Sequence, residues 1–444
     1  MFGYDLQLAL HGLKRFPRST VLAVITVALG LSASMTTLAL LHTLSADPLP
    51  GRSQHLYLTW VDTLLAKSVT QDSLNDIKSV DYHRIKLGDA QALLAAHRAP
   101  QQTALADMNA DVSNAAGTHL QTNETVLGTT STFIPMFGVP LREGRSWSAA
   151  EDATRSPVAV ITAPLAQRLF GAADAIGNTM LIHGKPFRVI GVSANYAPQP
   201  HFYDLSAGTF GDDTSESIFA PYSALLDAGV PPYTADGCDK ASAEKSLFNV
   251  DSQHCAWLSL WVQLDTPQQV AAYRQFLHGY VEQQQDALAA FHKSPHSALT
   301  RVAAWLTQQN VVPENVRLNV WLAGSFLLLC MLNVAGLLTA RFLRRSSEIG
   351  IRRALGAPRR SVFVQHVLEA AAVCLFGGVL ALPLTELGLW LLRLQDEGFT
   401  DLARLDPLMF GALFALALVV GVLVGLLPAW RAARVEPGLQ VKSA

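Results

Sequence analysis

The stretch SSEIGIRRALGAPRR, residues 346–360, holds five charged side chains, two glycines and a proline between two long apolar runs. One of its serines can cap a helix whose first turn carries Glu348, where a carboxylate suits the helix dipole. Ile351 and Leu355 then share one helix face, and Gly356 ends the helix. Such a short amphipathic helix needs a lipid interface or a protein groove to cover its apolar side. From the residues alone it is either a basic loop that fixes topology or a lever that docks on a cytoplasmic motor.

The composition indicates membrane spans joined to a soluble part. Half of the 444 residues are hydrophobic and only 15% are charged, whereas soluble chains carry about 25% charged residues. A helix needs about 20 apolar residues to cross the hydrocarbon core. The first apolar run could instead be a cleaved signal peptide, but it is longer than the usual hydrophobic region of about 7 to 15 residues. The predicted transmembrane helices are residues 19–44, 318–340, 361–392 and 408–430.

The basic residues predict the orientation of these helices. Lysine and arginine gather in residues 1–18, 341–360 and 431–444, and cytoplasmic loops carry an excess of both. We therefore expect both termini inside the cell, with a short loop at 393–407 and a large domain at 45–317 outside. The predicted fold class is an integral membrane α-helical protein whose large mixed α+β periplasmic domain is inserted between helices 1 and 2.

Short alternating and helical patterns fill the external domain. Strands are predicted at 55–61, 157–161 and 258–265, and as two halves of 179–192 joined by a GK turn. The run ESIFAPYSAL, 216–225, also has the composition of a strand. Helices are predicted within 81–98, at 163–170, and from Pro267 to about His292. Residues 194–211 and 227–253 give no clear pattern.

Cysteine placement agrees with an external domain. Cys238 and Cys255 lie in polar stretches, whereas Cys330 and Cys374 lie in apolar runs. An oxidising compartment permits a disulfide between the first two, which would contribute about 3 kcal/mol by closing the intervening loop. The alternative is a pair of free thiols that happen to be close in sequence.

The sequence lacks the motifs of an enzyme. It contains no G-x-x-x-x-G-K-[ST] phosphate loop, so it is not expected to bind ATP in that manner, and GxGxxG, HExxH, GxSxG and CxxC are also missing. The histidines show no metal-ligand spacing, and Asp212 with Asp213 is interpreted as a solvated loop rather than a calcium site. The chain is predicted to bind no cofactor, metal or nucleic acid.

A few residues within the apolar runs are unusual. Buried carboxylates in membranes are functional candidates, but His366, Glu369 and Glu386 lie near span ends, and we predict that they reach the solvated interface. Small residues permit close helix packing. The small residues in the predicted spans are Gly30, Ser34, Gly377, Gly378, Gly421 and Gly425. The GxxxG pair Gly421 and Gly425 is interpreted as ordinary packing between spans rather than a dimer interface.

Several segments together resemble one family. SSEIGIRRALGAPRRSVFVQHVLEA (346–370) is similar to the signature of the MacB/FtsX-like permease family of ABC transporters, in which this segment couples to a nucleotide-binding subunit. Residues 5–35 resemble the amphipathic N-terminal helix and first span of the family, and 425–442 its last span and tail. In the external domain, 133–147, 157–171, 175–192 and 218–225 are similar, in order, to the MacB-type periplasmic core domain. Residues 60–130 and 194–253 carry no resemblance.

The resemblance implies an inner-membrane permease that works as a dimer, with an identical or homologous chain, on two cytoplasmic ATPase subunits that bind the ATP. Because only about 18 residues precede the first span, we expect the ATPase on a separate chain. A periplasmic adaptor and an outer-membrane channel are the further partners of an efflux or secretion assembly, whose substrate would be a peptide, antibiotic or siderophore. The alternative is Lol-type lipoprotein extraction or FtsX-type signalling to a cell-wall hydrolase. The residues that match the coupling motif are Glu348, Ile349, Arg352, Arg353, Leu355 and Gly356.

Overall fold

The structure is a computed structural model. It describes residues 16–64, 83–171, 174–194, 196–203, 205, 210, 215–239, 251–284, 296–344, 351, 358–394 and 407–434. The chain divides into two compact units, a helical unit formed by residues 1–45 and 312–444 and a mixed unit formed by residues 46–311. The insertion of an α/β domain between the first and second apolar helices is as predicted.

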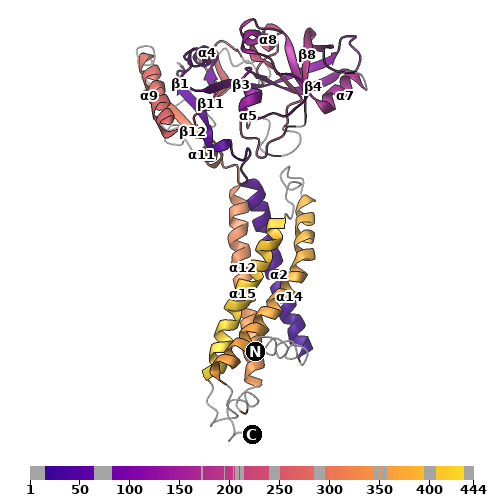
Figure 1. Cartoon of the computed structure of the whole chain (residues 1–444), viewed down its shortest axis with the longest axis vertical. Coiled ribbons are helices and arrows are strands. Elements are labelled where there is room, and N and C mark those ends of the chain that lie inside the picture. Colours follow the sequence, from indigo (N-terminus) through magenta and orange to yellow (C-terminus); the bar gives the residue numbers. More distant parts are fainter. Residues whose placement is uncertain are drawn as a thin grey trace. The chain divides into compact units, whose positions relative to one another are not determined.

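Within the described residues, four long helices form the helical unit, and each is apolar enough to cross a membrane. Helix α14 packs against both α2 and α15, and α12 packs against α2 (Figure 1). The predicted fold class of four transmembrane helices is therefore confirmed. The helices are α2 (Pro17–Leu44), α12 (Glu314–Arg344), α14 (Arg359–Arg393) and α15 (Pro407–Arg434).

Glycines set the close spacing of these helices. A Cβ atom added to Gly377 of α14 would lie 2.6 Å from Val27 Cγ1 of α2, and one added to Gly425 of α15 would lie 2.8 Å from Ala370 Cβ of α14. Gly421 faces α14 in the same way. The predicted role of small residues in close packing is confirmed, and the GxxxG glycines face a helix of the same chain.

A group of polar side chains lies inside the helical unit near the end of α12. His366 and Glu369 are only 3% and 1% exposed, and His366 Nδ1 lies 3.7 Å from Glu369 Oε2. The ring of Phe342 lies 3.9 Å from that of His366, and Arg341 Nε donates to Ser19 Oγ at 2.9 Å. The prediction that His366 and Glu369 reach a solvated interface is wrong, because the neighbouring helices enclose both side chains.

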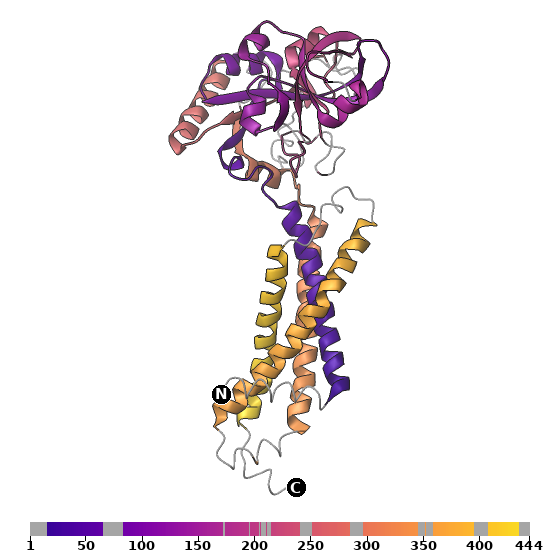
Figure 2. The same ribbon diagram turned by 45° about the vertical axis from the view of Figure 1, so that its right-hand side comes forward.

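The mixed unit is built on one sheet, which Figures 1 and 2 show in two views 45° apart. Within the described residues its strands follow the order β12-β1-β11-β3-β4-β9-β6-β8-β5, with β2 and β10 also pairing with β11, and β7 with β3 and β8. Most pairs are antiparallel, but β4–β9 and β6–β8 are parallel. The strands are β1 (Leu56–Asp62), β2 (Ile85–Lys86), β3 (Gln101–Asn114), β4 (Gln121–Thr129), β5 (Leu141–Gly144), β6 (Val158–Thr162), β7 (Thr179–Ile182), β8 (Lys185–Ser193), β9 (Ile218–Pro221), β10 (Gly237–Cys238), β11 (Cys255–Gln263) and β12 (His296–Arg301).

Both faces of the sheet are buried. Neighbouring residues of one strand, such as Ala104 and Leu105 of β3, belong to different hydrophobic cores, as expected when side chains alternate across a sheet. One core lies under helices α4, α7, α8 and α9, and the other contains aromatic residues of α5 and α11. These helices are α4 (Leu87–Ala95), α5 (Phe133–Phe137), α7 (Ala163–Phe170), α8 (Tyr222–Asp227), α9 (Pro267–Gln283) and α11 (Val302–Gln308).

The chain enters and leaves the mixed unit on neighbouring strands. After α2 it passes through the short 3-10 helix η1 (Ser53–His55) into β1, and it returns along β12 to α11. Strands β1 and β12 pair antiparallel from Tyr57–Arg301 to Asp62–His296. Helix α11 packs against β1, β12 and η1, so the two connections share one anchored corner of the sheet.

The predicted elements differ from the structure in two places. The run 216–225 is a strand only over β9, because Pro221 is followed by helix α8. Pro267 opens α9 as predicted, with Thr266 as its N-cap, but α9 ends at Gln283. The remaining part of that prediction, 285–292, lies outside the described residues.

Candidate functional site

All six residues of the predicted coupling motif, Glu348 to Gly356, lie outside the described residues. The described neighbours are the end of α12 at Arg344, the start of α14 at Arg359, and Ile351, whose side chain is 57% exposed. An exposed apolar side chain on an amphipathic segment is compatible with a partner surface.

Cys238 and Cys255 face one another across the antiparallel pair β10–β11 and are joined by a disulfide bond. Cys255 is fully buried and Cys238 is nearly so. The bond fastens the segment around β10 to β11, the strand that also pairs with β1 and β3.

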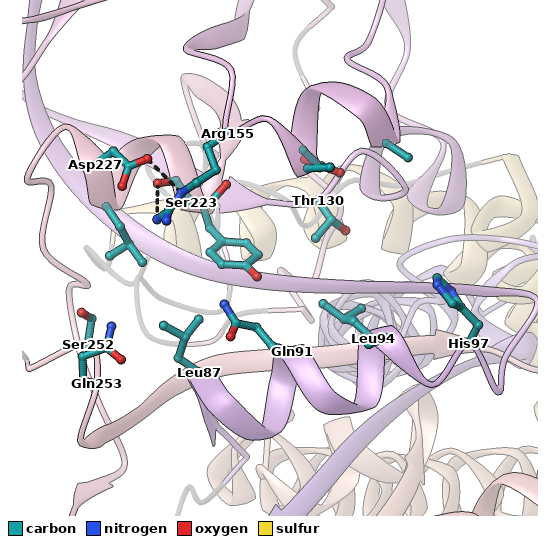
Figure 3. A pocket seen from close by; sticks show the side chains of 16 residues that line it. Leu87, Gln91, Leu94, His97, Thr130, Arg155, Ser223, Asp227, Ser252 and Gln253 are labelled. Atoms are coloured by element: carbon teal, nitrogen blue, oxygen red, sulfur yellow. Dashed lines mark hydrogen bonds and ion pairs between the residues drawn. The ribbon is translucent and has the colours of Figure 1, made fainter.

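A pocket of about 850 Å³ opens in the mixed unit between helices α4, α6 (Ala149–Ala153) and α8 (Figure 3). Helix α4 presents Leu87, Gln91 and Leu94 to it, at spacings of four and three residues that place side chains on one helix face. Opposite them lie Arg155 and Asp227. The full lining is Leu87, Gln91, Leu94, Ala95, His97, Thr130, Ala149, Asp152, Ala153, Arg155, Tyr222, Ser223, Leu226, Asp227, Ser252 and Gln253.

Asp152 is the carboxylate that α6 brings to the pocket. Its Oδ1 accepts a hydrogen bond from Trp147 Nε1 and its Oδ2 accepts one from the Ser131 amide, both at 2.7 Å. Both donors are uncharged. Partial burial removes water from this carboxylate and raises its pKa above the ordinary value, although the side chain and amide of Ser131 and the Trp147 indole oppose that rise.

Arg155 and Asp227 form an ion pair at the pocket edge. Arg155 Nε lies 2.8 Å from Asp227 Oδ2, and Arg155 Nη2 donates to the Ser223 carbonyl at 3.3 Å. Both side chains are about half exposed, so the pair contributes little to stability. Its effect on the pocket is to neutralise one of the two carboxylates.

Tyr222 supplies the aromatic surface of the pocket. Its ring packs edge-on against Trp257 at 6.3 Å between centroids, and Gln91 lies with it in the lining of the pocket. Burial raises the pKa of Tyr222, while Gln91 opposes the rise. The phenol is therefore neutral at physiological pH, where it is a hydrogen-bonding group.

The local sequence explains how α6 is held at the pocket. Ser148 Oγ accepts a hydrogen bond from the Glu151 amide and Glu151 caps the Ser148 amide in return, which forms a capping box. Arg145 bonds both oxygens of Glu151 at 2.8 Å. These bonds lower the pKa of Glu151 to about 2, so α6 is capped by a carboxylate that is ionised at physiological pH.

The backbone is strained at two lining residues. His97 and Arg155 have φ angles of 47° and 53°, in the left-handed region that residues other than glycine rarely adopt. Such conformations cost of the order of 1 to 3 kcal/mol and concentrate at functional sites. Both residues follow the end of a helix that lines the pocket.

A second buried polar cluster lies in the aromatic core. Glu216 accepts a hydrogen bond from Tyr203 Oη at 2.7 Å, and its other oxygen lies 2.9 Å from His201 Nε2. All three side chains are almost fully buried, and burial beside Glu216 raises the pKa of Tyr203 far above its usual range. The cluster is enclosed in the aromatic core, apart from the pocket. Within the described residues no group of three or more His, Cys, Asp or Glu could hold a metal ion.

Sequence patterns did not predict the pocket. Its lining comes from several separate stretches of the chain, which only the folded sheet brings together. One local signal was readable: Ser148 followed three residues later by Glu151 marks the start of a helix.

The comparisons with known proteins assign both units to one class. Residues 20–277, more than half of the chain, match the family described as MacB-like periplasmic core domain, and residues 320–437 match the FtsX-like permease C-terminal family. The pyoverdine export ATP-binding/permease protein PvdT of Pseudomonas syringae pv. syringae (strain B728a) is 28% identical over 321 residues, 70% of this chain and 41% of that protein. The macrolide export ATP-binding/permease protein MacB of Salmonella typhi is 25% identical over 319 residues, 70% of this chain and 42% of that protein.

The chain thus spans about two fifths of the length of these relatives. Among solved structures, the periplasmic region of MacB from Actinobacillus actinomycetemcomitans aligns with a TM-score of 0.36 and 16% identity, over 58% of this chain and 94% of that one. The family matches in both units show that the chain belongs to the MacB/FtsX-like permeases of ABC transporters.

Proposed function

We propose that this chain transmits ATP-driven motion of a separate cytoplasmic ATPase through its membrane helices to its external domain, and thereby drives export of a periplasmic substrate. The candidate substrate classes are peptides, antibiotics and siderophores. The names of two relatives, which refer to pyoverdine and macrolide export, support a role in export.

The observation that carries the proposal is the position of α2 in the helical unit. Helix α2 packs against both α12 and α14, the two helices that flank the predicted coupling segment. Arg341 at the end of α12 also hydrogen-bonds Ser19 of α2. Helix α2 leads along the chain into β1. A displacement of the coupling segment can therefore pass through the packed helices to α2, and from α2 along the chain to the sheet.

The assembly that follows from this proposal contains two ATPase subunits and a second permease chain, identical or homologous. The segment 341–360 and both termini face the cytoplasm, and residues 45–317 face the periplasm. An adaptor and an outer-membrane channel would receive the substrate. ATP hydrolysis takes place on the ATPase, and this chain contributes Glu348, Ile349, Arg352, Arg353, Leu355 and Gly356 to the contact.

The test is affinity purification of the tagged chain from native membranes in mild detergent, with quantitative mass spectrometry of the bound proteins. The double variant Arg352→Glu with Arg353→Glu reverses two charges of the coupling motif. We expect it to reduce the recovered ATPase at least tenfold. Equal recovery with the wild type would overturn the coupling proposal.

The matched control is Lys185→Glu with Arg188→Glu, which reverses two exposed charges on β8 of the mixed unit. This variant should recover the ATPase at the wild-type level. The remaining bound proteins distinguish the possible outputs. An adaptor and an outer-membrane channel support export, whereas lipoproteins or a cell-wall hydrolase move the assignment to extraction or signalling.

A further inference from the structure

The pocket between α4, α6 and α8 has the size of a small-molecule site. Ligand pockets for drug-sized molecules measure about 300 to 1,000 Å³, and this open pocket has a volume of about 850 Å³. It lies wholly within the mixed unit, and the disulfide between Cys238 and Cys255 fastens β10 to β11, the strand that follows its lining residues Ser252 and Gln253. Its volume is therefore within the range of small-molecule sites.

The charges that line the pocket favour a cation. Arg155 is paired with Asp227, so these two charges cancel. Within the described residues, Asp152 is hydrogen-bonded by Trp147 and Ser131, which are neutral, and its negative charge remains. Burial disfavours that charge, as its raised pKa indicates, and a cation in the pocket would stabilise it.

The remaining lining favours an amphipathic molecule. Leu87, Leu94 and Leu226 form apolar surface, and alanines of α4 and α6 add to it. The Tyr222 ring lies beside them, and aromatic faces attract organic cations. Hydroxyl and amide groups, such as those of Thr130 and Gln91, provide donors and acceptors around this surface.

We propose that this pocket binds an amphipathic organic monocation, with its ammonium or similar group toward Asp152 and its apolar part against α4. Its role as the site that receives the exported substrate rests on the proposed function. The binding itself requires no ATPase, so the two proposals fail separately.

The experiment measures fluorescence anisotropy of two xanthene dyes on the full chain in phosphatidylcholine nanodiscs. Rhodamine 123 is the cationic probe, fluorescein is the anionic one of similar shape, and empty nanodiscs give the background. We expect saturable binding of rhodamine 123 and at least tenfold weaker binding of fluorescein. Equal affinity for both dyes, or no binding above empty nanodiscs, would overturn the inference.

Two variants, one that removes negative charge from the pocket and one that adds it, test the role of charge. Asp152→Asn should raise the Kd of rhodamine 123 about tenfold, and Arg155→Gln should lower it several-fold because Asp227 then adds its charge to the pocket. Glu143→Gln removes an exposed carboxylate on β5, outside the lining, and should leave the Kd unchanged. The inference is wrong if the two pocket variants change the Kd in the same direction.

A filling variant tests the location without altering charge. Ser223→Trp places an indole in the cavity and should abolish dye binding, provided that its thermal unfolding matches that of the wild type. If it does not fold, Leu226→Phe replaces it. Binding that persists in the folded filling variant would place the dye elsewhere and refute the site. If rhodamine 123 binds but the variant Arg352→Glu with Arg353→Glu still recovers the ATPase, the pocket inference is supported and the coupling proposal is wrong.

Discussion

The carboxylate of Glu369 lies 3.7 Å from the imidazole of His366, one turn earlier on α14, and the helical unit encloses both. The ring of Phe342 covers His366 from α12. Burying ionisable groups among apolar helices is costly, and such groups in membrane proteins are functional candidates. Their position beside the end of α12 places them at the junction of the packed helices with the predicted coupling segment.

Replacing Glu369 should destabilise the helical unit. Glu369→Ala removes a buried carboxylate from its polar neighbours, and breaking such buried pairs costs about 3 to 5 kcal/mol. Glu386→Ala, on the same helix but at an exposed position, is the control. The measurement is the thermal unfolding midpoint in detergent micelles. Equal midpoints for the two variants would show that Glu369 is not held by its surroundings.

A methyl group at Gly377 should disturb the contact between α14 and α2. The added Cβ would lie 2.6 Å from Val27 Cγ1, so one helix must shift, and overpacking of this kind costs about 1 to 3 kcal/mol. Gly336→Ala on α12 meets nothing within 4 Å and should be neutral or slightly stabilising. Unfolding midpoints of the two variants test the difference, which would vanish if α2 and α14 were not in close contact.

Loss of the disulfide should weaken the mixed unit. With a sequence separation of 17 between its partners, the bond is expected to contribute about 3 kcal/mol. The double variant Cys238→Ser with Cys255→Ser should lose this contribution in urea unfolding followed by tryptophan fluorescence. Alkylation with and without reductant, read by mass, checks the bond itself. Labelling of Cys238 or Cys255 before reduction would contradict it. Cys330 and Cys374, which are buried, should be labelled only after unfolding.

The pair Arg145–Glu151 should make stability depend on acid pH. The pKa of Glu151 falls to about 2 in the folded chain, from an ordinary value of about 4.3. Its contribution is therefore complete above pH 4.3 and is lost as the pH falls toward 2. Because Arg145 is 54% exposed, we expect less than about 1 kcal/mol.

Glu151→Gln keeps a capping side chain but removes the charge, and serves as the variant for this test. The gap in urea midpoint between wild type and variant should be larger at pH 7 than at pH 3. It should also shrink in high salt, since the pair is partly exposed. A gap that is constant with pH would indicate that the ion pair contributes nothing.

The sequence was most informative where one periodic pattern decides the structure. The four apolar runs and the helix at 163–170 have regular spacing, and the hairpin of β7 and β8 turns at Gly184, whose φ of 75° favours glycine. Strand β3, QQTALADMNADVSN, was not predicted although apolar and polar residues alternate from Ala106 to Ser113. Alanine, aspartate and asparagine are depleted in strands, so its composition does not indicate one. The strand is buried because β11 and β4 pair with it on both sides.

The pocket and the buried pair escaped prediction for the same physical reason. The lining of the pocket belongs to segments that only the sheet order brings together, and no local spacing marks Asp152 or Tyr222 as neighbours of α4. His366 and Glu369 stand near the end of an apolar run, where solvation is the common outcome. Whether they face lipid headgroups or other helices depends on the rotation of α14, which is set by the packing of α2, α12 and α15.

The pairing of β1 with β12 determines how the sheet responds to force. Both covalent connections to the helical unit leave from the same end of this pair, at Leu56 and Arg301. Pulling the two connections apart loads the packing of α11 against η1 and then the Tyr57–Arg301 pair, so the hydrogen bonds between β1 and β12 open one after another. Pulling both connections in the same direction, along the strands, loads the hydrogen bonds between β1 and β11 in shear, where many of these bonds must break at once. We therefore expect the mixed unit to yield more readily to separation of α2 and α12 than to their joint displacement.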